Sequence, residues 1–128
     1  MLFHSTRGKD PNKDFASILM QGLADDGGLF MPDYWPQVDL DEIKSKTSFV
    51  DIAKCIVPLF TSSSFSYDET IAIVESTWHN FEHQDLIGIR DFNSVSILEL
   101  FHGPTAAFKD FGLQLAAAFF NKVLESEN

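Results

Sequence analysis

The sequence is most constrained between residues 94 and 124, where a strongly apolar stretch is interrupted by one Gly-Pro pair. In residues 94–101, apolar side chains occupy both odd and even positions, a pattern typical of a strand buried on both faces. Gly103 and Pro104 end that strand, because proline cannot donate to a sheet ladder and favours an extended residue before it. Residues 106–124 are apolar nearly all round at helical spacing, so we expect a helix that is covered on most sides.

Lys109 is the candidate reactive residue of this strand-to-helix unit. A helix capped by Thr105 would place Lys109 in its first turn. The helix dipole and a low dielectric both disfavour an ammonium at such a position and would lower the lysine pKa from about 10.4. The neighbouring Asp110 favours the charged amine, so the residues alone do not fix the sign of the net shift. The common alternative is a lysine that simply reaches water beside an acid.

Three motifs, in order along the chain, resemble those of the threonine synthases, pyridoxal 5′-phosphate (PLP) enzymes of fold type II. The first two are Ser-Thr-Arg-Gly at residues 5–8 and Gln-Gly-Leu-Ala-Asp-Asp-Gly-Gly-Leu-Phe-Met-Pro at residues 21–32. The third is Glu-Leu-Phe-His-Gly-Pro-Thr-Ala-Ala-Phe-Lys-Asp-Phe-Gly at residues 99–112, which resembles the family's cofactor-lysine motif. The resemblance covers nearly the whole chain.

This resemblance implies that Lys109 is both the catalytic and the cofactor-binding residue, through a Schiff base with PLP. Family chemistry would exchange that bond for the amine of O-phospho-L-homoserine, eliminate phosphate and add water to give L-threonine. Two alternatives stay open: a threonine-synthase-like phospho-lyase that releases a keto acid, and a non-catalytic module in which Lys109 is structural. No other residue is assigned a role.

Threonine synthases continue for several hundred residues past the lysine helix, so we expect this chain to be the N-terminal fragment of a longer enzyme. The seven glycines form no G-x-G-x-x-G phosphate cradle, and Gly27-Gly28 is predicted to be a turn. We therefore expect the fragment alone to be inactive and not to retain PLP. Its apolar helix at residues 106–124 is expected to dock on another copy, swap or fray.

The expected fold class is mixed α/β in two parts. Residues 1–84 would form the mainly helical N-terminal domain with short strands, and residues 85–128 the start of a truncated PLP-binding domain. Capping residues and helical or alternating periodicity carry this division. The expected helices are 14–21, 39–45, 48–60 and 66–81, besides 106–124, and the expected strands are 2–6, 29–31, 86–90 and 94–101.

Composition agrees with a cytoplasmic globular protein, and the resemblance implies a small-molecule substrate. Nine Lys and Arg against 19 Asp and Glu give a net charge of −10, which argues against nucleic acid and anionic membrane surfaces as partners. A hydrophobic share of 45% with 13 Phe suffices for one core. No signal peptide or membrane-spanning run is evident. The single Cys55 can form no internal disulfide and is predicted to be a small buried hydrophobic residue.

One motif points to a different chemistry. His79-Asn-Phe-Glu-His83 matches the H-x-x-E-H pattern of inverted zinc peptidases. The apolar Trp78 and Phe81 lie on the same turn and no third ligand is evident, so we expect a solvated helix end and no metal. Arg7 could hold an anion, but we expect it to be a surface loop residue.

Overall fold

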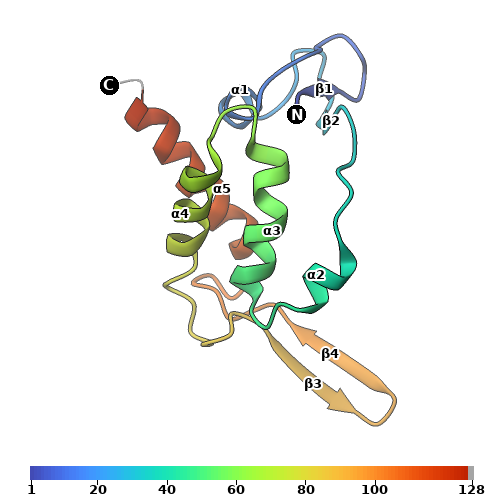
Figure 1. The fold of residues 1–128 in the computed structure, drawn as a ribbon, viewed down its shortest axis with the longest axis vertical. Helices are drawn as coiled ribbons and strands as arrows, with labels where there is room; N and C mark the ends of the chain where they lie inside the picture. Colours follow the sequence, from blue (N-terminus) through green and yellow to red (C-terminus); the bar gives the residue numbers. More distant parts are fainter. Residues whose placement is uncertain (127–128) are drawn as a thin grey trace.

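The computed structural model describes residues 1–126, which form five helices and two separate two-stranded antiparallel sheets. Helices α3 to α5 make up the body, the β3–β4 hairpin projects from one end, and α1 with the β1–β2 sheet lies at the other (Figure 1). The expected mixed α/β class is confirmed. The helices are α1 (Phe15–Gln21), α2 (Leu40–Lys44), α3 (Phe49–Thr61), α4 (Tyr67–Thr77) and α5 (Lys109–Ser126), and the strands are β1 (Phe3–Ser5), β2 (Phe30–Pro32), β3 (Gly88–Phe92) and β4 (Val95–Glu99).

The first four helices begin where the sequence predicts, because each has a side-chain cap. Asp14 accepts from the backbone N–H of Ser17 at the start of α1, and Asp39 accepts from two backbone N–H groups of α2. Ser48 caps α3, and Ser66 opens α4 with a complete capping box. These caps satisfy backbone donors that would otherwise be unpaired at the helix starts.

The core lies where α3, α4 and α5 meet. Its buried members are joined by aromatic side chains from all three helices, and the Phe49 ring lies 5.0 Å from Trp78 and 5.1 Å from Phe111. A second aromatic group packs α1 on α5, since Phe15 lies 5.2 Å from Phe119, which is only 1% exposed. The buried residues of the main cluster are Ala53, Val74, Trp78 and Leu86.

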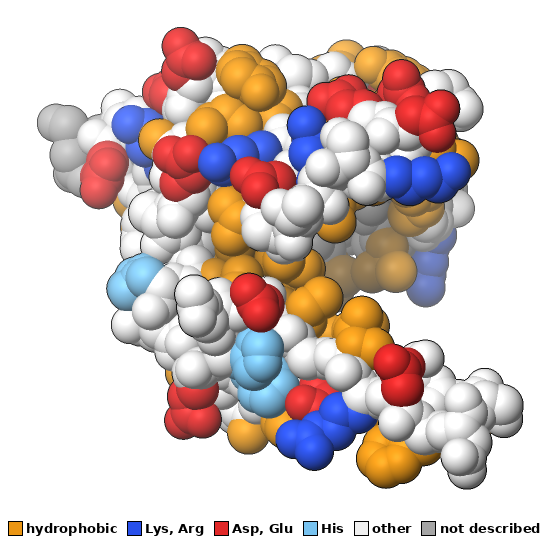
Figure 2. Space-filling model, turned by 60° about the horizontal axis from the view of Figure 1, so that its bottom comes forward, with side chains coloured by type: hydrophobic (Ala, Val, Ile, Leu, Met, Phe, Trp, Pro, Cys, Tyr) orange, Lys and Arg blue, Asp and Glu red, His pale blue; other side chains and the backbone are white. Residues whose placement is uncertain are grey.

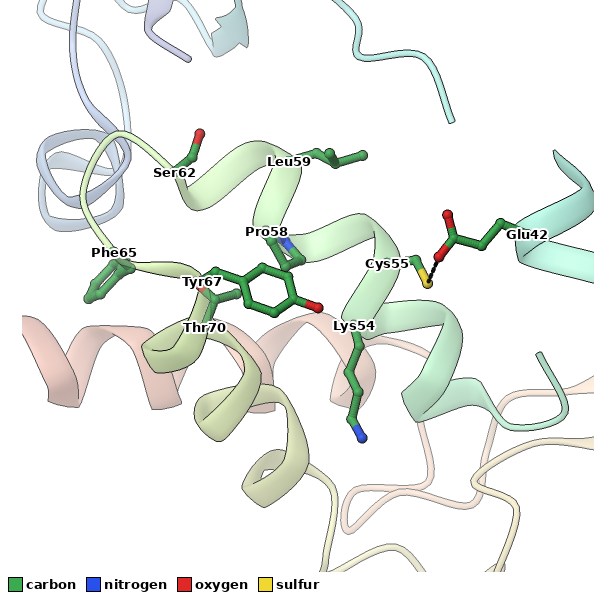
Figure 3. Close-up of a pocket in the computed structure, with 9 residues that line it drawn as sticks. All are labelled: Glu42, Lys54, Cys55, Pro58, Leu59, Ser62, Phe65, Tyr67 and Thr70. Carbon is green, nitrogen blue, oxygen red and sulfur yellow. Dashed lines mark hydrogen bonds between the residues drawn. The ribbon is translucent and has the colours of Figure 1, made fainter. Parts of the chain in front are cut away.

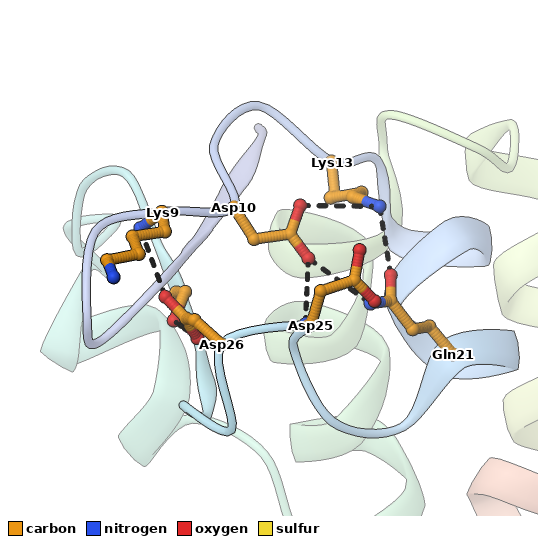
Figure 4. A network of polar contacts seen from close by, with 7 residues as sticks. Lys9, Asp10, Lys13, Gln21, Asp25 and Asp26 are labelled. Carbon is orange, nitrogen blue, oxygen red and sulfur yellow. Dashed lines mark hydrogen bonds and ion pairs between the residues drawn. The ribbon is translucent and has the colours of Figure 1, made fainter.

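A polar network closes the N-terminal segment around α1 (Figure 4). The carboxylate of Asp10, 8% exposed, pairs with Lys13 at 3.3 Å and accepts from the Gln21 amide at 3.2 Å. Lys13 also donates to the Gln21 side-chain oxygen at 2.9 Å. These contacts fix the loop between β1 and α1 against the end of that helix.

The hairpin agrees with the predicted strand pair, but the predicted burial of residues 94–101 is wrong. β3 and β4 pair with Gly88 opposite Glu99, and Asn93 adopts a positive φ of 52° in the tight turn between them. Ile97 and Leu98 are 49% and 53% exposed although they point to opposite faces. The reason is that no helix in the described residues packs extensively on β3 or β4, so both faces of the hairpin stay open to solvent.

The last helix also differs from expectation. α5 begins at Lys109 instead of residue 106, because Ala106 adopts a left-handed φ of 54° that a helix cannot contain. It buries one stripe, including Phe119 and Val123, while Leu113 on another side is 60% exposed. The expectation that this helix is covered on most sides is therefore wrong for the part of the chain that the structure describes. No helix between residues 1 and 126 is long and apolar enough to cross a membrane.

Candidate functional site

Lys109 is the first residue of α5 and is exposed to solvent. Its side chain makes no hydrogen bond or salt bridge with any other side chain in residues 1–126. The expected position in the first turn is confirmed, but the expected deep burial of that turn around the lysine is wrong. The reason is that α5 turns the face carrying its next residue, Asp110, toward the interior and leaves Lys109 outside. The amine is thus accessible to a reactant from solvent.

Asp110 fixes the turn that precedes the helix. Its side chain is 1% exposed, and its two oxygens accept from the hydroxyl of Thr105 at 2.6 Å and from the Thr105 backbone N–H at 2.8 Å. The hydroxyl bond is the main reason that the pKa of Asp110 lies below its usual value, and burial opposes that shift. Thr105 therefore does not cap the helix as expected; it donates to a side chain inside α5.

The carboxylate of Glu99 holds the start of the loop that joins β4 to α5. Glu99, 9% exposed at the end of β4, accepts from Arg90 Nε at 2.5 Å and lies 3.1 Å from His102 Nε2. The His102 ring lies 4.7 Å from that of His83. Histidine side chains can be seen beside an acidic and a basic side chain near the base of the hairpin (Figure 2). Glu99 thus links the hairpin to the loop that leads toward Lys109.

The first turn of α5 is also held by contacts with the end of α4. Trp78, at the end of α4, donates from its indole Nε1 to the backbone oxygen of Phe111 at 3.1 Å. The Phe111 ring packs on Phe81 at 4.9 Å. The first turn of α5 is therefore attached to the core of the helical segment.

The two N-terminal motifs meet each other. The Asp26 carboxylate accepts from the Ser5 hydroxyl at 2.6 Å and from the backbone N–H of Gly28 at 2.9 Å. Arg7 is an exposed loop residue, as expected, and donates to the backbone oxygen of Asp26 at 2.9 Å. Among residues 1–126, no hydrogen bond or ion pair joins these motifs to the segment at 99–112. Their contacts support a role in the N-terminal fold.

A pocket of about 360 Å³ lies elsewhere, between α2, α3 and α4 (Figure 3). Cys55 lines it, half-exposed, with Sγ 3.7 Å from Glu42 Oε1. The prediction of a buried Cys55 is therefore wrong, because the thiol faces the gap between α2 and α3 instead of the core. Lys109 is not among the residues that line this pocket.

The H-x-x-E-H motif does not lie on a helix. α4 ends at Thr77, so His79 and His83 do not share a helical face. His79 Nδ1 lies 2.8 Å from the backbone oxygen of Ser76, and His83 Nδ1 accepts from the backbone N–H of Asp85 at 3.2 Å. Within residues 1–126, no group of three or more potential ligands is placed to hold a metal ion.

Lys109 is singled out by its motif, whereas the residues that hold the turn around it become visible only in the structure. Glu99, His102 and Asp110 are neighbours of Lys109 in sequence, yet proximity alone gave them no role. The one sequence feature that could have pointed to these contacts is the glycine at 103, which in the structure is buried and lies against Asp110. A Cβ added at Gly103 would lie 2.5 Å from Asp110 Cβ, which indicates a close approach between the loop and the helix.

Together, the fold and the site define a mixed α/β protein whose helical segment supports a strand-turn-helix unit with an accessible lysine. Residues 2–78 match the family described as "Threonine synthase N terminus". The threonine synthase of Pseudomonas aeruginosa is 39% identical over 127 residues, which cover 97% of this chain and 27% of that protein. Threonine synthase-like 2 of Homo sapiens is 36% identical over 129 residues, which cover 98% of this chain and 27% of that protein.

Solved structures agree with these matches. The PLP-bound threonine synthase from Brucella melitensis superposes with a TM-score of 0.91 at 34% identity, covering 99% of this chain and 28% of that one. The yeast threonine synthase gives a TM-score of 0.88 at 32% identity, covering 98% and 27%. The chain therefore belongs to the threonine synthase family. It spans about a quarter of the length of the relatives that it matches.

Proposed function

We propose that this chain is the N-terminal part of a threonine synthase, which converts O-phospho-L-homoserine and water to L-threonine and phosphate with PLP. The observation that carries the proposal is an accessible lysine amine, Lys109, at the start of α5 in a family with a PLP-bound structure. The acidic net charge of −10 is compatible with a small-molecule enzyme of the cytoplasm, which is where we place it.

The residues present fit the cofactor at one point. An amine that is to condense with an aldehyde must be reachable, and Lys109 is exposed and makes no hydrogen bond or salt bridge within residues 1–126, although the Asp110 carboxylate attracts it. Lys109 Nζ would hold the cofactor by its aldehyde carbon and, once released, would take up and return a proton near the substrate. When bound, PLP supplies an electron sink for the charge that develops beside the substrate amine.

The proposed domain division is 1–84 for the N-terminal domain and 85–128 for the start of the cofactor domain. The two segments share one core: Leu86 packs with Val74 and Trp78, and Trp78 donates to Phe111. The proposed division therefore does not separate two hydrophobic cores. It separates a supporting segment, residues 1–84, from the segment that contains Lys109, residues 85–128.

We further propose that the 128-residue chain by itself is inactive, does not retain PLP and self-associates. Phe108, just before α5, is 68% exposed, and Leu113, within α5, is 60% exposed. The hairpin exposes further apolar side chains. Light scattering coupled to gel filtration would show a dimer or larger species that dissociates when Leu113 is replaced by Glu. A monomer at all concentrations would contradict this proposal.

A second candidate is a threonine-synthase-like phospho-lyase with the same lysine and cofactor. It is favoured by the 36% identity to threonine synthase-like 2, which is close to the identity to the threonine synthases. Product analysis separates the two, because the lyase would release ammonia and a keto acid. A structural lysine in a non-catalytic module would give no product at all.

The test of the proposed function is covalent trapping on the full-length protein. PLP is added, the mixture is reduced with borohydride, and the peptides are mapped by mass spectrometry. We expect one reduced pyridoxyl group per chain, on Lys109, and L-threonine and phosphate as products of O-phospho-L-homoserine. A Lys122→Ala variant, which changes another lysine of α5, serves as the control and should label normally. Absence of label on Lys109 would contradict the proposal.

A further inference from the structure

The loop between β4 and α5 contains a hydrogen-bonded turn with one residue in a left-handed conformation. Residues 100–108 contain no helix or strand, yet Ala106 donates from its backbone N–H to Gly103 O at 3.0 Å and holds a left-handed φ of 54°. A non-glycine residue in that region is strained and persists only where neighbouring contacts hold it. The question is therefore which contacts keep this turn closed.

The Asp110 carboxylate supplies them. Both of its oxygens are used by Thr105, five residues earlier, through the hydroxyl and the backbone N–H. Hydrogen bonds to an ionised acceptor are shorter and about twice as strong as those between neutral groups. Gly103 covers the carboxylate so closely that any Cβ there would overlap it. The closed turn is thus built around one buried charge.

The Lys109 side chain has no comparable hydrogen bonds that hold it in place in the described residues. Its side chain is exposed and is attracted to the Asp110 carboxylate, but it makes no hydrogen bond or salt bridge within residues 1–126, so the direction of its amine depends on the backbone at the start of α5. That backbone is fixed on one side by Trp78, through Phe111, and on the other by Asp110. The adjacent residue therefore holds the turn from which the reactive amine projects.

We propose that Asp110 is a positioning residue, which clamps Thr105 and so holds the amine of Lys109 in place for reaction. The proposal rests on the proposed function for the chemistry of Lys109. The clamp itself is a property of residues 103–110. Misplacement of a reacting group by about 1 Å can lower a rate by about 100-fold, so a clamp of this kind can matter without touching the reactants.

The experiment uses the full-length protein with PLP and compares four variants with the unsubstituted enzyme. Asp110→Asn and Thr105→Val weaken the clamp, and Thr105→Ser keeps both of its donors. Asp68→Asn is the matched control, because Asp68 is also an acid in the first turn of a helix but is exposed. Backbone hydrogen exchange of residues 103–108 and the rate of borohydride trapping at Lys109 are measured, with kcat and KM as a third readout.

For Asp110→Asn and Thr105→Val we expect exchange in residues 103–108 to accelerate by about tenfold or more and trapping to slow. We also expect kcat to fall by roughly 10- to 100-fold with a smaller change in KM. Thr105→Ser and Asp68→Asn should each show exchange, trapping and kcat close to those of the unsubstituted protein. Asp110→Asn with exchange and trapping equal to those of Asp68→Asn would overturn the clamp. If the unsubstituted protein traps no PLP, the proposed function fails, while the exchange measurement still decides whether the clamp exists.

Discussion

The indole of Trp78 donates to the backbone oxygen of Phe111 over 3.1 Å, and this bond ties the end of α4 to the first turn of α5. It joins residues 33 positions apart and crosses from the helical segment to the unit that contains Lys109. The N-terminal helices therefore act as the support on which the lysine turn is built.

Replacing Trp78 with Phe should weaken this support while keeping an aromatic ring in the core. The Phe111 oxygen loses the indole donor, and we expect the free energy of unfolding to fall by about 1–2 kcal/mol. Urea denaturation followed by circular dichroism measures this change. Trp35→Phe is the control and should stay within about 0.5 kcal/mol, because Trp35 is 64% exposed. Equal stabilities of the two variants would argue against a supporting role for the bond.

Two glycines should respond to alanine in opposite directions. At Gly28 an added Cβ would overlap the hydroxyl of Ser5, which is 1% exposed and held by Asp26, so we expect a loss of about 1–3 kcal/mol. At Gly112, within α5, nothing lies within 4 Å of an added Cβ. There we expect a gain of about 0.5–1 kcal/mol from the better helix propensity of alanine. Thermal unfolding of both variants of this chain measures the contrast, and a destabilising Gly112→Ala would contradict it.

Stability should fall at acid pH through Asp26. The Ser5 hydroxyl bond lowers the pKa of Asp26 from its usual value near 3.8, against the opposing effect of desolvation. Because the pKa is lower in the folded state than in the unfolded state, this contribution is complete above about pH 4 and is lost as the pH falls further. Urea titrations between pH 2.5 and 6 should show a shallower acid loss for Asp26→Asn than for the unsubstituted chain. Parallel curves would show that Asp26 makes no such contribution.

The thiol of Cys55 should react without unfolding. It is half-exposed at the wall of the pocket between α2, α3 and α4, and the sequence contains no other cysteine. Titration with Ellman's reagent under native conditions should therefore release one equivalent of chromophore per chain. Release that requires denaturant would mean that the thiol is buried, as its sequence pattern suggested.

The helix starts could be predicted because capping is local. Asp14, Ser48 and Ser66 each accept from a backbone N–H three residues away, so their effect is visible in a short stretch of sequence. The hairpin could be predicted for the same reason, since its turn and alternation lie within 12 residues.

Burial and the supporting contacts of the site could not be predicted in this way. An apolar pattern in residues 94–101 indicates a surface that needs covering, but it does not say which segment covers it, and β4 is exposed on both faces here. The clamp between Thr105 and Asp110 depends on the left-handed backbone of Ala106, for which hydrophobic periodicity gives no signal. The Trp78–Phe111 bond joins distant residues, and sequence spacing alone does not reveal such a contact.

The central claim is that the amine of Lys109 carries the chemistry. Its most direct test is the rate at which the full-length protein releases phosphate and L-threonine from O-phospho-L-homoserine when Lys109 is changed to Ala. We expect the rate to fall by about 10³-fold or more, while Lys122→Ala, which alters a half-exposed lysine of the same helix, stays within about twofold. Turnover by Lys109→Ala at the rate of the unsubstituted protein would contradict the account.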